Sequence, residues 1–203
     1  MYVPAAFTAR DDDVQQLLAH HGAADLVTAG PDGPEATMLP FVHDPDRGAL
    51  LGHFARGNDH WRRVDGQRCL VIVRGPDSYI SPSWYASKAE HGRVVPTWNY
   101  VTAHLHGTAV VHDDADWVAD VVRRLTDLHE TGRPDPWSVD DAPERFVRGQ
   151  LRAIVGVEVR IDRVDAKFKL SQNRPAADVD GVVARLRAAG HTEGADAVAT
   201  HRR

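Results

Sequence analysis

The sequence predicts a mainly β fold, a small antiparallel barrel or sandwich with helices at its periphery. Short apolar runs of strand length follow one another between residues 24 and 73, and turn-forming residues separate each run from the next. An alternating apolar pattern over residues 151–168 predicts a longer strand that closes the barrel. Strands joined by short turns form a meander, which is how small antiparallel barrels begin.

The N-terminal elements are expected to be one helix and four strands. Three consecutive aspartates begin a helix that runs from Asp11 to about His21, because acidic side chains favour the positive end of the helix dipole. Pro40 has no backbone N–H and therefore predicts an edge position or a bulge in the second strand. The four strands are expected at residues 24–29, 35–43, 49–55 and 68–73.

A candidate anion site follows the third strand, in the sequence Arg56-Gly57-Asn58-Asp59. Asn58 stands where a helix N-cap belongs, and Asp59 stands in the first turn. A helix that begins there would direct its free N–H groups toward the space beside Arg56, whose planar guanidinium suits a phosphate monoester. The alternative is an ordinary strand–turn–helix connection with a solvated Arg56.

Residues 76–100 are the most aromatic part of the chain. Trp84, Tyr85, Trp98 and Tyr100 have few apolar neighbours in sequence, so they cannot all pack into a local core. We expect them to wall a planar ligand or to close a subunit interface. The alternative is a structural loop that plugs one end of the barrel.

A long strand is expected from residue 97 to residue 111, with Gly107 as a bulge or a point of close approach. His104 and His106 fall on one face of it. Such a pair could supply two metal ligands, but spacing places no third ligand. A surface or hydrogen-bonded role is favoured, and no metal site is predicted.

The C-terminal half is expected to combine three helices with the long closing strand. A helix capped within His112–Asp114 runs to about Glu130 and presents one apolar stripe to the core. The basic segment Lys167–Pro175 either reaches back over a polar ligand or is an ordinary strand exit. The remaining elements are a short helix at residues 138–149, the strand at 151–168, a helix at 178–189 and a weaker helical or frayed end.

Composition narrows the classes of function. The 203 residues carry a formal net charge of −5, so no global basic field is present to hold DNA or an anionic membrane. The single cysteine, Cys69, lies in an apolar run and is expected to be a buried thiol. The N-terminal sequence shows no signal peptide, and no apolar run reaches the length of a membrane span. These features lead us to expect a soluble, cytoplasmic protein.

Six sequence motifs spread in order along the chain resemble one family. They are MYVP at the start, LPF, LLGHFARGNDHWR, YISPSWY, VVPTWNY and FKLSQNRP. Together they are similar to the PaiB-type proteins, labelled FMN-binding negative transcriptional regulators. The resemblance implies an FMN-binding split β-barrel of antiparallel Greek-key type, related to pyridoxamine-phosphate oxidase-like flavoproteins. It also implies a homodimer with two flavin sites at the subunit interface, with residues 1–175 as the flavin-binding domain and 176–203 as its helical extension.

The resemblance also implies roles for individual residues. The phosphate and ribityl chain of FMN would lie along residues 37–41 and 51–56. The phosphate-side candidates are His53, Arg56, Asn58, Trp61 and Arg62. The flavin-ring candidates, which could come from the other subunit, are Thr97, Trp98 and Asn99. The candidates for substrate or flavin contact in the C-terminal motif are Lys169, Ser171, Gln172 and Arg174.

One departure from the oxidase pattern bears on the cofactor. Related oxidases carry a Ser-Arg-Lys-like cluster after the phosphate strand, whereas this chain has Arg56-Gly57-Asn58. Flavin affinity is therefore expected to be weaker or differently organised.

The sequence leaves several functions open. The first is a flavin-dependent redox or flavin-sensing protein in which FMN carries the chemistry. No residue is marked as an acid, base or nucleophile, so no catalytic residue is named. A regulator is the second, but the absence of a basic stripe and of a helix-turn-helix pattern disfavours direct DNA binding. Haem is an alternative cofactor, with His53, His104, His106 and His191 as candidate axial ligands. A phosphorylated aromatic metabolite would also suit a phosphate cradle beside aromatic walls.

Overall fold

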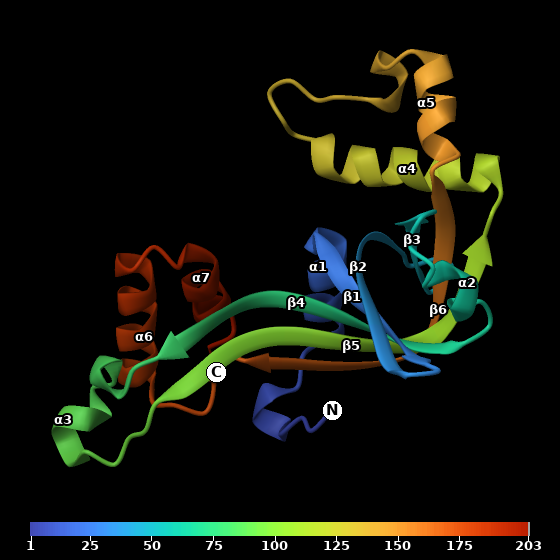
Figure 1. The fold of residues 1–203 in the computed structure, drawn as a ribbon. Helices are drawn as coiled ribbons and strands as arrows, with labels where there is room; N and C mark the ends of the chain where they lie inside the picture. Colours follow the sequence, from blue (N-terminus) through green and yellow to red (C-terminus); the bar gives the residue numbers. More distant parts are fainter. Residues whose placement is uncertain (203) are drawn as a thin grey trace. The chain divides into compact units, whose positions relative to one another are not determined.

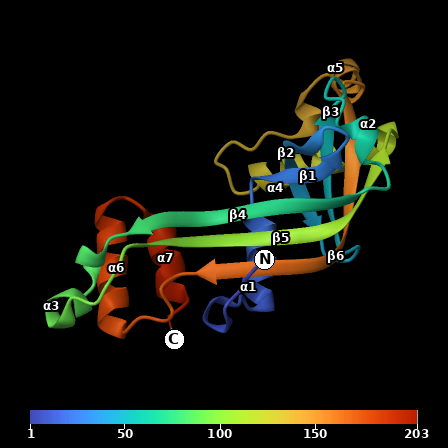
Figure 2. The same ribbon diagram turned by 60° about the horizontal axis from the view of Figure 1, so that its bottom comes forward.

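The computed structural model describes residues 1–202, and these form two compact units. Unit 1 combines residues 1–14 and 74–103 with the described residues from 165 onward. Unit 2 combines residues 15–73 and 104–164. Figures 1 and 2 show the helices and strands of each unit.

Six strands form a closed barrel in the order β1-β2-β3-β6-β5-β4. The pairs β1–β2, β1–β4, β2–β3 and β3–β6 are all antiparallel. The predicted antiparallel barrel with peripheral helices is therefore confirmed. The strands are β1 (Ala23–Gly30), β2 (Gly33–Asp44), β3 (Ala49–Ala55), β4 (Arg68–Ile80), β5 (Thr97–His112) and β6 (Ile154–Lys169).

Unit 2 contains β1, β2 and β3 in full, and its core lies on β3. Leu51 and the neighbouring Ala49 are fully buried against Val121 and Leu125 of helix α4 (Ala115–Glu130). The apolar stripe predicted for this helix thus covers the barrel as expected. Asp114 caps α4, because its side chain accepts a hydrogen bond from the backbone N–H of Trp117.

Two glycines and a proline in the barrel mark close backbone contacts. A side chain at Gly107 would collide with the backbone of Arg160, which confirms Gly107 as a point of close approach. Pro40 is the last β2 residue paired with β1, and pairing with β3 begins at Phe41. Gly52 of β3 passes so close to the Pro40 carbonyl that a Cβ would not fit. Pro40 therefore sits where β2 changes partner, and it needs no N–H there.

In unit 1, helices α6 (Ala176–Ala188) and α7 (Thr192–Thr200) pack side by side, as Figures 1 and 2 both show. Val182, Leu186 and Val198 are buried in this pair. The buried Asp178 of α6 accepts hydrogen bonds from the N–H and the hydroxyl of Ser87, both at 2.9 Å. These bonds hold α3 (Ser87–His91) against α6.

Several element boundaries differ from the expected ones. The helix expected at residues 138–149 is a 3-10 turn, η3 (Val139–Asp141), followed by α5 (Glu144–Leu151), because Pro143 interrupts it. Strand β4 continues to Ile80, seven residues beyond the apolar run that predicted it, since the polar residues that follow still pair. Of the two forms expected for the C-terminal end, helical or frayed, the structure has the helix α7 (Thr192–Thr200). The remaining elements are η1 (Ala5–Phe7), α1 (Asp11–His20), α2 (Trp61–Val64) and η2 (Pro82–Trp84).

Within residues 1–202, no helix is long and apolar enough to cross a membrane.

Candidate functional site

The turn after β3 carries the predicted phosphate-side residues, but it has a different form from the one predicted. Helix α2 consists of Trp61–Val64 only, and no side chain caps it. Asn58 lies before the helix, in a turn closed by its own N–H on the Ala55 carbonyl at 2.9 Å. Its side-chain oxygen accepts the N–H of His60 at 3.0 Å. The prediction that Asn58 caps a helix is therefore wrong, and a helix this short supplies little dipole for an anion.

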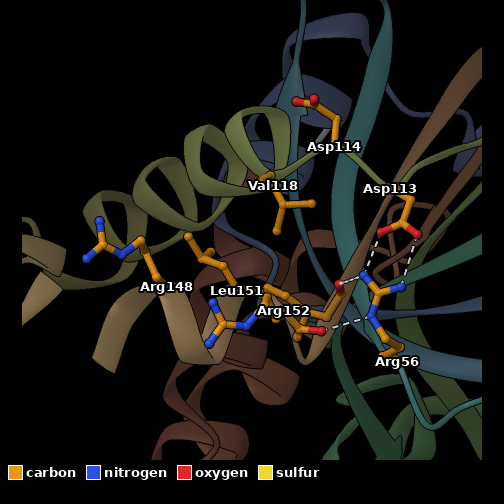
Figure 3. A pocket seen from close by; sticks show the side chains of 9 residues that line it. Arg56, Asp113, Asp114, Val118, Arg148, Leu151 and Arg152 are labelled. Atoms are coloured by element: carbon orange, nitrogen blue, oxygen red, sulfur yellow. Dashed lines mark hydrogen bonds and ion pairs between the residues drawn. The ribbon is translucent and has the colours of Figure 1, made fainter. Parts of the chain in front are cut away.

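Arg56 is fully engaged by its own unit (Figure 3). Its two terminal nitrogens donate to the carboxylate of Asp113 at 3.0 and 2.5 Å. Nε donates to the Arg152 carbonyl at 2.8 Å, and Nη2 also reaches the Ile154 carbonyl at 3.1 Å. The hydrogen bonds with Arg56 lower the pKa of Asp113 and raise the pKa of Arg56. Arg56 is partly exposed, but its donors are occupied by Asp113 and by two carbonyls, so they are not available to phosphate in this arrangement.

Arg56 and Asp113 border a cavity of about 340 Å³ beside the start of α4. Val118 and Leu151 give it an apolar floor, and Arg152 adds a further cation. The carboxylate of Asp113 already neutralises Arg56, so this cavity holds less net positive charge than its arginines suggest.

Trp61 and Arg62 support the same turn. The indole N–H of Trp61 donates to the Arg56 carbonyl at 3.0 Å. The guanidinium of Arg62 lies 4.8 Å from the Trp61 ring centre and is paired with Asp59 at 3.0 Å. Both side chains therefore contact the protein itself in this structure.

His53 of β3 is half-buried, and its Nδ1 atom is buried without a hydrogen-bond partner in the described chain. Burial lowers the pKa of His53, which keeps the imidazole neutral near pH 7. A neutral imidazole with an unused nitrogen is able to accept a ligand proton or to bind a metal centre.

His60, which sequence reasoning did not select, links three elements of unit 2. It is fully buried, and its ring nitrogens lie 2.8 Å from the hydroxyls of Thr28 and Thr37 on β1 and β2. Asn58 also donates to the Thr37 hydroxyl, at 3.2 Å. Burial lowers the pKa of His60. No local signal identifies this network, because only the pairing of β1 with β2 brings the two threonines together.

Unit 1 gathers most of the other predicted residues. Lys169 Nζ donates to the Thr97 hydroxyl and, at 2.6 Å, to the Trp98 carbonyl. Asn99 and Ser171 are both buried and hydrogen-bond one another, with Asn99 Nδ2 donating to Ser171 Oγ at 3.0 Å. Strand β5 and the end of β6 are thereby joined through their side chains.

Gln172 and Arg174 have different surroundings. Gln172 stabilises its own turn, donating to the Phe168 carbonyl at 2.5 Å and accepting the Leu170 N–H at 2.8 Å. The guanidinium of Arg174 lies 4.6 Å from the centre of the Tyr85 ring. Gln172 is therefore a structural residue here, while the described side-chain contacts of Arg174 are with Tyr85 and not with a carboxylate.

A cavity of about 190 Å³ in unit 1 brings five predicted residues together. Its lining includes Thr97, Asn99, Lys169, Ser171 and Arg174. Tyr85, from the aromatic segment, also lines it, but Trp98 and Gln172 do not. Of the unit 2 candidates, Arg56 alone lines one of the cavities described for that unit, the one in Figure 3.

The part of the chain that the structure describes contains no group of three or more histidine, cysteine, aspartate or glutamate side chains that could hold a metal ion.

The fold is that of split-barrel flavin-binding proteins. It matches the structure of an FAD and haem binding protein from Mycobacterium smegmatis with a TM-score of 0.60 at 19% identity, covering 80% of this chain and 72% of that one. It also matches the flavocytochrome Anf3 from Azotobacter vinelandii with a TM-score of 0.57 at 15% identity, covering 78% of this chain and 67% of that one. At these identities the likeness concerns the fold alone.

The sequence places the chain more narrowly. Residues 1–163 match the family model described as "Putative FMN-binding domain". Over 190 residues the chain is 32% identical to "Protease synthase and sporulation protein PAI 2" of Bacillus subtilis, covering 92% of this chain and 89% of that protein. The chain belongs to this FMN-binding, PaiB-type family. The predicted resemblance is thereby confirmed, and FMN as the predicted cofactor agrees with the family.

Proposed function

We propose that this chain is an FMN-binding protein that works as a homodimer, with the flavin as its redox or sensing group. The observation that carries the proposal is the match of residues 1–163 to an FMN-binding family. The identity of 32% to the PAI 2 protein over nearly the whole chain supports it.

The side chains present fit such a cofactor. An FMN phosphate needs cationic or neutral hydrogen-bond donors, and the isoalloxazine ring needs flat walls with a few polar contacts. Lys169 and Arg174 are cations whose described contacts are all with uncharged groups. His53 offers an unused imidazole nitrogen, and Trp98 presents a half-exposed indole.

We assign the remaining predicted residues as follows. Asn58, Trp61 and Arg62 shape the turn after β3 on the phosphate side, and Thr97 and Asn99 approach the flavin ring. Ser171 and Gln172 fix the course of the C-terminal motif. Arg56 contributes to phosphate binding only if the phosphate replaces Asp113, because its donors are otherwise occupied. When bound, FMN supplies reversible one- or two-electron transfer, and these residues bind and orient it.

A regulatory role follows the family label and would be indirect. The net charge of −5 gives no field for DNA, so we expect a partner or a small molecule to carry the signal, within the cytoplasm.

The test is an absorbance spectrum of the purified protein, repeated after FMN is added and the sample is desalted. Retention of the two visible absorption bands of oxidised flavin is the expected result. Size-exclusion chromatography with light scattering measures the molar mass of the same sample, which is expected to be that of a homodimer. Loss of all flavin on desalting, together with no change in flavin fluorescence during titration, would contradict the proposal.

Haem is a second candidate ligand, favoured by His53. The structures that share this fold include an FAD and haem binding protein and a flavocytochrome. Burial lowers the pKa of His53, and the neutral imidazole is the form that binds a haem iron. Haemin should then produce a Soret band that the wild-type chain retains and that His53→Ala loses, whereas a band unchanged in His53→Ala would exclude this residue as the ligand.

A further inference from the structure

The cavity of unit 1 bordered by Tyr85, Lys169 and Arg174 has the composition of an anion site. Its volume is about 190 Å³, whereas pockets for a complete drug-sized ligand measure roughly 300–1,000 Å³. It therefore has room for one group of a larger molecule. Its lining includes Lys169 and Arg174 but no aspartate or glutamate.

Positive charge is uncompensated at this cavity. No carboxylate among the described residues forms an ion pair with Lys169 or Arg174. Burial lowers the pKa of Lys169, and the charges of Lys167 and Arg174 lower it further. Lys169 is therefore repelled by two further cations, and a bound anion would reduce this repulsion. Lys167 itself donates to the Tyr2 carbonyl at 3.3 Å and lies 5.4 Å from the Tyr100 ring centre.

Tyr85 supplies an independent observation. Its side chain is 3% exposed, and its hydroxyl is buried without a partner in hydrogen-bond geometry among residues 1–202. Burial raises the pKa of that hydroxyl, while the side chains of Arg174 and Ser171, which lie close to it, lower that pKa. A buried hydroxyl without a partner is unfavourable, so such groups are few in folded proteins. The nearest carboxylate that affects Tyr85, that of Asp178, is already bonded to Ser87. An oxygen of a bound anion would accept the Tyr85 proton.

The larger cavity of unit 2 lacks these features. Its lining includes two carboxylates, those of Asp113 and Asp114. Arg56 is paired with Asp113, and Arg148 is paired with Glu144 at 2.6 Å. This leaves Arg152 as the arginine of this lining without a described ion pair. No buried, unpartnered polar group lines it in the described chain. The two cavities therefore differ in the carboxylates of their lining, which are present in unit 2 and absent in unit 1.

We propose that Tyr85, Lys169 and Arg174 form a binding site for the phosphoryl or carboxylate group of a small ligand. Arg174 provides a planar pair of donors, Lys169 a point charge and Tyr85 a neutral hydroxyl donor, a set suited to a tetrahedral or planar oxyanion. The anion belongs either to the flavin or to a second ligand. The site stands on the geometry of unit 1 and does not depend on FMN being bound.

Isothermal titration calorimetry with inorganic phosphate, and separately with acetate, tests the site on the full chain. Sodium chloride replaces each anion at equal ionic strength as the blank. The wild-type chain should bind phosphate saturably. Tyr85→Phe keeps the ring under Arg174 and removes the hydroxyl alone, so phosphate affinity should fall severalfold. Arg174→Gln should lower it by about 10–100-fold, as expected for a charge-assisted bond.

Two controls separate binding from folding and from general charge. Arg185→Gln removes an exposed arginine of α6 that lies outside the cavity, so it should bind phosphate as the wild type does. Circular dichroism and thermal unfolding report whether Tyr85→Phe and Arg174→Gln remain folded. If Arg174→Gln unfolds, Tyr85→Phe alone still decides the result.

Repeating the titration with FMN-saturated protein identifies the source of the anion. Unchanged phosphate affinity would support a second ligand, and competition with FMN would support the flavin phosphate at this site. Saturable phosphate binding with no FMN binding would overturn the proposed function and leave the site standing. Equal phosphate affinity in wild type, Tyr85→Phe and Arg174→Gln, or no phosphate binding at all, would overturn the site.

Discussion

The two units differ in what they do with their cations. In unit 2 the arginines nearest the predicted phosphate turn are matched by acidic side chains, as in Arg56–Asp113 and Arg63–Glu35, each with a contact of 2.5–2.6 Å. In unit 1 Lys169 and Arg174 meet only hydroxyl, carbonyl and aromatic groups. A cation paired at this distance must first lose its partner before it binds an anion. The units therefore differ in readiness for an anionic ligand, although their sequences look similarly basic.

The buried side chains His60 and Tyr85 also differ, although unit 2 has buried atoms without a partner at His21 Nε2 and His53 Nδ1. Unit 2 buries His60 between two threonine hydroxyls, a closed network with every ring nitrogen satisfied. Unit 1 buries Tyr85 with its hydroxyl unsatisfied. A satisfied network stabilises a fold, and an unsatisfied group is typical of a site that waits for a ligand. Substitutions in each unit and a pH series test this difference between the units.

The largest expected effect is on the His60 network. His60→Ala should lower the free energy of unfolding by about 2–4 kcal/mol, because it leaves a cavity and removes the ring's hydrogen bonds to the hydroxyls of Thr28 and Thr37. Urea unfolding at pH 7.5 measures the loss. His20→Ala, at an exposed position of α1, is the matched control and should change stability little. A loss below about 1 kcal/mol for His60→Ala would show that the network is not stabilising.

Acid should destabilise unit 2 before its carboxylates titrate. Burial lowers the pKa of His21, His43, His53 and His60 below the ordinary value of 6.5, and all four lie in unit 2. Unfolded histidines then bind more protons than folded ones, so stability is full above pH 6.5 and falls as pH decreases through the lowered pKa values. Urea midpoints measured from pH 7.5 to 5 should decrease. A flat profile over that range would contradict the assignment of these histidines as buried and neutral.

A smaller effect is expected at Ser171, the one described non-glycine residue with a positive φ, of 66°. Ser171→Gly and Ser171→Ala both remove the hydroxyl that bonds Asn99. Only alanine keeps a Cβ in the left-handed region, so the glycine variant should be about 1 kcal/mol more stable than the alanine variant. Thermal unfolding of the pair measures the difference. Equal stability would mean that the backbone at Ser171 is unstrained.

The smallest expected effect is a gain of binding in unit 2. Asp113→Asn removes the charge opposite Arg56 and keeps a side chain of the same size. In an Arg174→Gln background the site in unit 1 binds phosphate only weakly. There, Asp113→Asn should raise the phosphate affinity of the protein severalfold, as measured by calorimetry. No gain would show that the carbonyls of Arg152 and Ile154, rather than Asp113, keep Arg56 from anions.

The sequence was sufficient for the fold because alternation and turn residues are local signals. The strand ending at Ala55 and the apolar stripe of α4 are read from neighbouring residues, and both are present. The candidate site was only partly accessible. Motif resemblance selected Lys169 and Arg174, but nothing local shows that Asp113, 57 residues away in sequence, occupies Arg56.

The turn after β3 illustrates the same limit. Asn58 followed by Asp59 favours a helix cap by residue type, yet the chain closes a turn first and begins α2 at Trp61. His60 was missed because its partners come from two other strands. The division at residue 175 and the flavin-contact roles of individual residues stay predictions.

Calorimetric titration of phosphate into the wild type, Arg174→Gln and Arg56→Gln decides whether the anion site lies at Arg174 of unit 1 or at Arg56 of unit 2. We expect Arg174→Gln to weaken phosphate binding by about 10–100-fold. Arg56→Gln should bind phosphate as the wild type does, because the arginine that it removes is already paired with Asp113. Loss of binding in Arg56→Gln with full retention in Arg174→Gln would contradict this expectation and return the anion site to unit 2.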